Sequence, residues 1–153
     1  MKSVIALITS ARALFSLIAV TIALGTSGTA LAGVETQVCG PQTLQGSYVF
    51  TAQGFTIVSG VAQPKAIVEG VDFNGDGTLS VPFGTVSING FIIQIPPGGV
   101  GTYTLDSSCE GTLTFTTGPV NYNLSVHQNG KEIWMIQTDA NTVFEGTVKK
   151  VSR

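Results

Sequence analysis

The fold is decided by residues 120–137, VNYNLSVHQNGKEIWMIQ. Asn129-Gly130 lies between two runs of alternating polar and apolar residues, which is the pattern of a type I′ β-hairpin turn. A turn there pairs His127 with Glu132 and Ser125 with Trp134, and side chains directly opposite share a face. One face is then largely apolar and is predicted to face the core: Tyr122, Leu124, Val126, Ile133, Met135 and Gln137. The other face carries Asn123, Ser125, His127, Glu132, Trp134 and Ile136.

Further strands are expected on both sides of this hairpin. Two more Asn-Gly pairs, Asn74-Gly75 and Asn89-Gly90, predict two-residue turns, and Pro96–Gly99 is expected to be a loop because proline cannot donate to a strand ladder. A hairpin connection is expected at Ser107–Gly111. The expected strands are Ser47–Gln53, Ala66–Phe73, Thr78–Phe83, Thr85–Ile88, Phe91–Ile95, Gly101–Asp106, Thr112–Thr117, Val120–His127, Lys131–Thr138 and Val143–Lys149.

Consecutive strands with one apolar face each bury those faces best by closing the sheet on itself, which also removes exposed strand edges. The sequence therefore predicts an all-β fold, a single antiparallel meander β-barrel of about eight strands. A β-sandwich is the second choice.

The N-terminal segment has the pattern of a secretory signal peptide. In residues 1–32, the basic residues Lys2 and Arg12 precede an apolar run from Ala13 to Leu24. The small residues Ala30 and Ala32 then form the pattern of a signal-peptidase site, with cleavage after Ala32. The predicted domains are this leader and a β-barrel domain at 33–153. We expect the mature protein to be secreted or periplasmic, with no stable membrane insertion once the leader is removed.

The mature segment is acidic. Removal of Lys2 and Arg12 leaves five of the seven basic residues against all nine acidic ones, a net charge of −4. The only basic cluster is Lys149, Lys150 and Arg153. Because so short a cluster neutralises few phosphates, nucleic acid is not expected as a partner.

Two cysteines, Cys39 and Cys109, are predicted to form a structural disulfide. An exported protein matures where disulfides persist, and no neighbouring base in the sequence points to a reactive thiol. The bond would close a loop of about 70 residues, worth about 4 kcal/mol in the chain-entropy model.

The order of several short motifs resembles small secreted bacterial proteins, largely uncharacterised, with calycin-type barrels. The motifs are Cys39, Leu44-x-Gly46-x-Tyr48, Gly70-x-Asp72-Phe73, Gly75-Asp76-Gly77, Gly101-Thr102-Tyr103, Cys109-Glu110-Gly111 and Gly146-Thr147-Val148. Gly46-Ser47-Tyr48 stands where lipocalins have Gly-x-Trp. Barrels of this form include carriers of apolar ligands and cyclases such as allene oxide cyclase, so the resemblance implies a fold but no particular catalytic residue.

The leading functional hypothesis is a barrel that binds a small hydrophobic molecule in its interior, without a cofactor or a metal. The expected walls are Tyr48, Phe50, Tyr103, Phe115, Tyr122, Leu124 and Met135, with Gln137 as a polar contact. One alternative is a cofactor-free cyclase or isomerase of the allene-oxide-cyclase type. Another is a non-catalytic structural or surface-interaction protein whose own side chains fill the barrel.

Three polar positions allow two interpretations each. Glu69 either joins Gln137 as a ligand contact or faces outward, with Gln137 at the barrel mouth in water. Asp72–Gly77 resembles the start of a calcium loop, but Phe83 stands where the twelfth-position glutamate belongs, so a hairpin turn is favoured over a weak calcium site. His127 beside Glu132 is read as a solvated cross-strand pair rather than a general base.

Two apolar features point toward a homo-oligomer. Trp134 and Ile136 fall on the outer face of the last hairpin, where a subunit contact would cover them, and isolated surface exposure is the alternative interpretation. The segment Phe91–Ile95 is apolar on successive residues, which indicates either a strand buried on both sides or an edge that packs against another chain.

Overall fold

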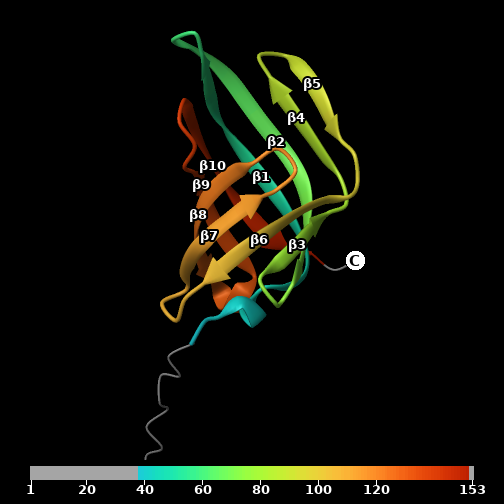
Figure 1. The fold of residues 1–153 in the computed structure, drawn as a ribbon, viewed down its shortest axis with the longest axis vertical. Coiled ribbons are helices and arrows are strands. Elements are labelled where there is room, and N and C mark those ends of the chain that lie inside the picture. The colour runs from blue at the N-terminus through green and yellow to red at the C-terminus, as the bar shows by residue number, and fades with distance from the viewer. Residues whose placement is uncertain (1–37, 152–153) are drawn as a thin grey trace, which may run out of the picture. The chain divides into compact units, whose positions relative to one another are not determined.

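Ten strands and two short 3-10 turns form the protein in the computed structural model, which describes residues 38–151 (Figure 1). The strands are β1 (Gln45–Val58), β2 (Val61–Asn74), β3 (Thr78–Val81), β4 (Gly84–Ile88), β5 (Phe91–Ile95), β6 (Gly99–Leu105), β7 (Glu110–Phe115), β8 (Val120–His127), β9 (Glu132–Gln137) and β10 (Thr142–Lys150). The turns are η1 (Pro41–Thr43) and η2 (Gln128–Gly130). Each of the ten predicted strands is confirmed. The predicted signal peptide lies outside the described residues, and within them no helix is long and apolar enough to cross a membrane.

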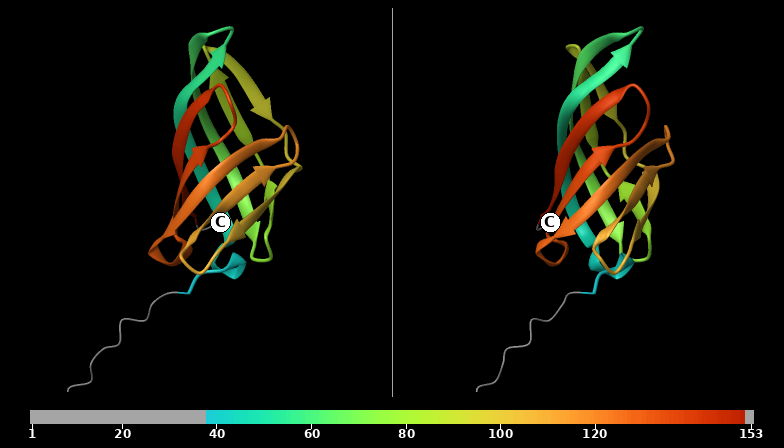
Figure 2. Two further views of the ribbon diagram at one scale, coloured as in Figure 1. Left: turned by 60° about the vertical axis from the view of Figure 1, so that its left-hand side comes forward. Right: turned by 90° about the vertical axis from the view of Figure 1, so that its left-hand side faces the viewer.

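Eight strands close into a ring in the order β1-β10-β9-β8-β7-β6-β3-β2, and β2 pairs with β1 to complete it. All these pairings are antiparallel, so the closed barrel is confirmed over the sandwich. The remaining two strands form a hairpin, β4–β5, that is attached to β2. Figure 2 shows this hairpin and the β1–β2 turn extending at the end opposite η1. We call the η1 end the base and the opposite end the open end.

Proline residues interrupt two strands at the same level. Pro82 separates β3 from β4, and Pro96-Pro97 separates β5 from β6, because proline has no N–H to give to a ladder. The halves near the base, β3 and β6, join the ring. The other halves form the β4–β5 hairpin, in which β5 pairs with β4 alone among the described strands. Phe91–Ile95 is therefore an edge strand, and Phe91 is 72% exposed.

The strands β1 and β2 run further toward the open end than the sequence predicts. Residues 54–65 continue the β1–β2 ladder and turn at Ser59-Gly60, where both residues have positive φ. Gly54 and Pro64 conceal this extension in the sequence. The predicted two-residue turn at Asn74-Gly75 is wrong, because β2 includes Asn74 and a three-residue connection, Gly75–Gly77, leads to β3.

The core lies where period-two alternation places it. Every residue of the predicted core face of the last hairpin is buried except Gln137, which is half-buried, and the register pairs His127 with Glu132 as expected. The largest fully buried side chains are Tyr48, Phe50, Phe144, Leu44, Leu79, Leu113, Ile133, Val71 and Val148.

Two glycines allow neighbouring strands to approach closely. A Cβ at Gly146 of β10 would overlap the carbonyl oxygen of Thr51 on β1, and one at Gly111 of β7 would overlap that of Thr104 on β6. Both glycines occupy inward positions in register with buried residues, Gly146 with Met135 and Gly111 with Leu124. The absence of a side chain at these positions lets the wall bend as the ring requires.

Candidate functional site

The base of the barrel is closed by the chain itself. The Tyr103 hydroxyl donates to the carbonyls of Pro41 at 2.8 Å and Leu44 at 3.1 Å, which fixes η1 across the opening. The Tyr48 hydroxyl donates to the carbonyl of Gly130 at 2.7 Å. The ring of Phe73 makes edge-on contacts with both tyrosines, at centroid distances of 5.1 and 5.0 Å. The predicted ligand contacts Tyr48 and Tyr103 thus lie in a packed region, and their hydroxyls are hydrogen-bonded to backbone carbonyls.

The disulfide Cys39–Cys109 secures the same end, as the sequence predicts. It joins the segment before η1 to the β6–β7 turn across 70 residues. There are no free cysteines among the described residues.

The middle of the barrel is packed with side chains from opposite walls. Tyr122 makes edge-on contacts with Phe50 at 5.7 Å and with Phe115 at 6.0 Å between ring centroids. Leu124 and Met135 are buried beside one another on paired strands. These predicted wall residues all face inward, and Phe115 and Tyr122 also border an empty space toward the open end.

This space is a chamber of about 350 Å³, within the range of small-molecule sites. The inner face of β2 forms one wall, and the β5–β6 connection and the β7–β8 turn form the other. Its lining includes the core-facing side chains Ile67, Glu69, Val81, Val86, Phe115 and Tyr122. The two proline breaks produce the chamber, because they draw β4–β5 away from the ring at this level.

Glu69 is the one charged residue that is buried in the described core, at 5% exposure. Its strand register, opposite Phe50 and Gly84, turns the side chain inward, so the outward alternative is wrong. Among residues 38–151 its carboxyl group has no hydrogen-bond partner. Burial raises the pKa of Glu69 to about 7, and the positive charge of Lys65 opposes this rise.

A chain of hydrogen-bonded side chains begins at Lys65, whose charge acts on Glu69, and leads to Asp139. Lys65 donates to Gln137 Oε1 at 3.2 Å, and Gln137 Nε2 donates to Asp139 at 2.8 Å. The Lys65 ammonium also lies 4.2 Å from the centre of the Phe144 ring. Burial lowers the pKa of Lys65, while the charges of Asp139 and Glu69 act in the opposite direction. Gln137 thus lies on the inner face near the open end, with protein partners for its amide.

Tyr122 shares the chamber with Glu69. Burial raises the pKa of its hydroxyl, and the negative charge of Glu69 adds to the rise. Tyr122 therefore stays protonated, while Glu69 exchanges its proton near neutral pH. The arrangement offers one exchangeable proton within apolar walls.

Sequence reasoning missed Lys65 and Asp139. Lys65 occupies the same face as Ile67 and Glu69 at a spacing of two, and that alternation was the available signal. Pro64 obscured it by suggesting that the strand starts later. Asp139 lies in the β9–β10 turn, where hydrogen bonds from the backbone and side chain of Asn121 and from Gln137 lower its pKa.

The other predicted candidates have local roles. In the β2–β3 connection Asp76 accepts hydrogen bonds from the backbone and hydroxyl of Thr78, at 2.9 and 2.6 Å, so this segment is a turn. The His127 ring lies 4.2 Å from that of Trp134, and Glu132 pairs with Lys149 at 3.4 Å. No group of three metal-ligating side chains occurs in the described part of the chain.

The fold and contacts define the class of protein: a closed antiparallel β-barrel with one disulfide, plugged at the base and opening into a small, mostly apolar chamber. No known family profile matches the chain, and no curated protein sequence gives a significant match. Among solved structures, it is similar to a de novo designed fluorescence-activating β-barrel, with a TM-score of 0.47 and 12% identity over 72% of this chain and 96% of that one.

Proposed function

We propose that the protein binds a small, largely apolar molecule in the chamber at the open end, with Glu69 as its polar contact. The observation that carries this proposal is the chamber itself. Its walls are mostly aliphatic and aromatic, and it contains one buried carboxyl group, that of Glu69, on which the charge of Lys65 at the chamber wall acts. An apolar ligand gains free energy by leaving water, and one hydrogen bond to Glu69 would orient it.

This proposal places the ligand on a subset of the predicted wall. Phe115 and Tyr122 border the chamber, and Ile67 and Val86 join them. Tyr48 and Tyr103 are given a supporting role at the base, because their hydroxyls already hold backbone carbonyls.

The test is binding of N-phenyl-1-naphthylamine, a neutral fluorescent probe, to the purified mature protein. Val86→Phe should fill the chamber and reduce binding, whereas Val68→Phe, which faces solvent on β2, should leave it unchanged. Circular dichroism checks that both variants fold. If both variants bind the probe equally well, the probe binds outside the chamber. If the wild type does not bind it, the proposed binding of apolar molecules is wrong.

A second candidate is a cofactor-free isomerase or cyclase, favoured by the pKa of Glu69 of about 7. A carboxyl group with this pKa can donate or accept a proton at neutral pH. Mass spectrometry and chromatography of lipophilic molecules recovered from the protein separate the two candidates. A carrier returns its ligand unchanged, whereas an isomerase returns a rearranged product, and Glu69→Gln should abolish that conversion.

We also propose that the protein works outside the cytoplasm, as a secreted or periplasmic protein. The Cys39–Cys109 disulfide and the leader-like sequence support this location. Fractionation of the host followed by alkylation of free thiols tests it. The proposal requires the oxidised, leader-free protein in the periplasm or the medium, and a reduced protein in the cytoplasm would contradict it.

A further inference from the structure

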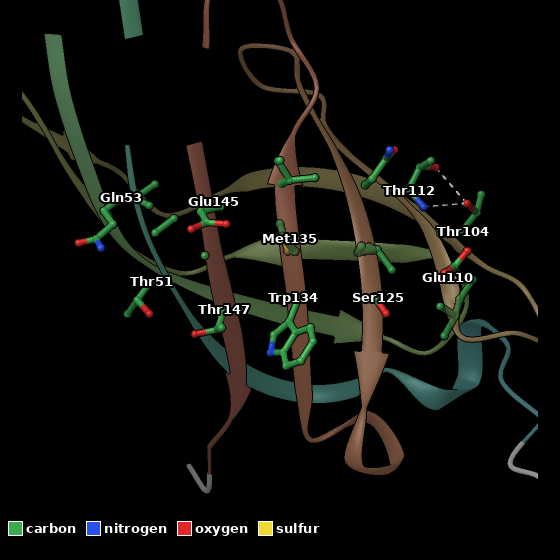
Figure 3. Close-up of a pocket in the computed structure, with 18 of the residues that line it drawn as sticks. Thr51, Gln53, Thr104, Glu110, Thr112, Ser125, Trp134, Met135, Glu145 and Thr147 are labelled. Atoms are coloured by element: carbon green, nitrogen blue, oxygen red, sulfur yellow. Dashed lines mark hydrogen bonds between the residues drawn. The ribbon is translucent and has the colours of Figure 1, made fainter. Parts of the chain in front are cut away.

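The outer wall of the barrel carries a second and larger hollow of about 1130 Å³. Strand register arranges its side chains in two rows that cross the strands. The first row is Thr51, Thr147, Trp134, Ser125 and Glu110. The second row is Gln53, Glu145, Ile136, Asn123, Thr112 and Thr104. Figure 3 shows the labelled members of both rows along neighbouring strands, with Trp134 near the middle.

Trp134 is an exposed aromatic platform in this hollow. Its side chain is 54% exposed, because its direct neighbours across the strands are the small hydroxyl residues Thr147 and Ser125. The ring of His127 lies 4.2 Å away at an interplanar angle of 37° and supports the indole from one side. The indole is therefore braced by a neighbour while it remains accessible.

The surroundings of Trp134 are rich in hydrogen-bonding groups and negative in charge. Hydroxyl, amide and carboxylate side chains occupy most positions of the two rows, and each can accept hydrogen bonds. Asp106, Glu110 and Glu145 line the hollow, and no lysine, arginine or histidine is among its described lining residues. Such a surface repels anionic molecules. It also includes apolar residues, among them Leu105, Met135 and Ile136, so hydrogen-bonding groups and apolar surface lie side by side.

We propose that this outer hollow binds an oligosaccharide made of neutral sugars or amino sugars. A pyranose ring presents C–H bonds that pack against the negative face of an indole, and its hydroxyls require hydrogen-bond partners around that contact. Neighbouring strands are about 4.8 Å apart, so each row offers a polar side chain at intervals close to the length of one sugar ring. The carboxylates favour an amino sugar over a uronic acid. Ile67 lines both this hollow and the chamber, and the other lining residues of the two spaces differ.

The chain contains one tryptophan and three tyrosines, so emission excited selectively from tryptophan reports on Trp134. We would titrate the purified protein with cellohexaose, with a glucosamine hexamer and with hexagalacturonate. The proposal expects a saturable change in Trp134 emission with the first two and none with the third. Absence of any change, together with no heat in calorimetry with either of the first two, overturns it.

Variants test the platform by calorimetry. Trp134→Ala should weaken binding by at least about tenfold, since a central tryptophan commonly dominates an interface. Trp134→Tyr should retain part of the affinity, and Ile92→Ala, an exposed apolar residue on β5, serves as the matched control and should change nothing. Glu145→Gln should weaken binding of the glucosamine hexamer more than binding of cellohexaose. Equal affinity of Trp134→Ala and wild type would refute the site.

A second copy of the chain is the competing occupant of Trp134 and Ile136. Light scattering after size-exclusion chromatography distinguishes the two. A monomer whose emission responds to sugar supports the proposal, whereas a dimer that Trp134→Ala converts to a monomer overturns it.

Discussion

Tyr48 and Gly130 lie 82 residues apart, and the hydroxyl of the first donates a buried hydrogen bond of 2.7 Å to the carbonyl of the second. The contact links β1 to the turn between β8 and β9 across the base of the barrel. Because Gly130 is itself buried, its carbonyl loses its partner if the hydroxyl is removed.

Tyr48→Phe should therefore lower the free energy of unfolding by about 1–3 kcal/mol, the cost of a buried group left without its bond. Urea denaturation measures this loss. Tyr122→Phe is the matched control, since the Tyr122 hydroxyl has no hydrogen-bond partner among residues 38–151 and its removal should cost less. An equal loss in both variants would show that the Tyr48 bond contributes nothing of its own.

The disulfide should contribute roughly 4 kcal/mol, given the 70 residues between its cysteines. Cys39→Ala combined with Cys109→Ala should lower the urea midpoint by a corresponding amount. Reductant should lower the midpoint of the wild type and leave that of the double variant unchanged. If reductant also lowers the urea midpoint of the double variant, its effect on the wild type does not measure the stabilisation by the disulfide.

Gly146→Ala should destabilise the barrel by several kcal/mol, because the new Cβ would overlap the Thr51 carbonyl and the flanking strand. Gly118→Ala provides the comparison. It lies in open space with a φ of 76°, so the substitution adds only the left-handed strain of about 1 kcal/mol. Thermal unfolding of both variants shows which substitution costs more stability. A smaller loss for Gly146→Ala than for Gly118→Ala would contradict the close approach of β10 to β1 at Gly146.

Glu69 should make the protein less stable as the pH rises. Its pKa is about 7 in the folded chain against an ordinary value of 4.5, so the folded state binds more protons between these values. The free energy of unfolding then falls from pH 4.5 to 7 by something on the order of 3 kcal/mol and levels off above. Glu69→Gln should remove this decline. Urea denaturation of the wild type and of Glu69→Gln from about pH 4 to 9 gives the free energy of unfolding of each protein at each pH. If the two free energies change with pH in parallel, the pKa of Glu69 is not raised.

Lys65→Met should raise the pKa of Glu69 further, because the ammonium charge now favours the carboxylate. Carbon-13 NMR titration of the Glu69 carboxyl group measures the shift. Lys150→Met, which removes a cation above the Tyr48 ring at the base, should leave it unchanged. A lower Glu69 pKa in the Lys65 variant would rule out this electrostatic link.

The strands and the last hairpin follow from the sequence because their signals are local. Alternation of two and an Asn-Gly turn are enough to pair His127 with Glu132 and to bury Leu124. The closed ring follows from the same pattern, because an open sheet of these strands would leave apolar edges.

The chamber depends on relations that the sequence pattern does not contain. Glu69 follows the apolar run 66–68, so alternation leaves its face undetermined, and only its pairing with Phe50 and Gly84 turns it inward. The empty space arises where two proline breaks, one before and one after the β4–β5 hairpin, meet at one level of the wall. Lys65 was overlooked because Pro64 resembles the start of a strand.

The pairing of β1 with β10 makes the first and last wall strands neighbours, from Tyr48 opposite Lys150 to Thr56 opposite Thr142. The ring would therefore keep its strand pairings if the chain were opened at another point and its present ends were joined. A circular permutant that joins the region after Val151 to the region before Cys39 through a linker, and opens the chain at Gly118, retains all eight wall pairings. Such a rearranged chain would carry new termini beside the chamber, where a reporter domain can be fused.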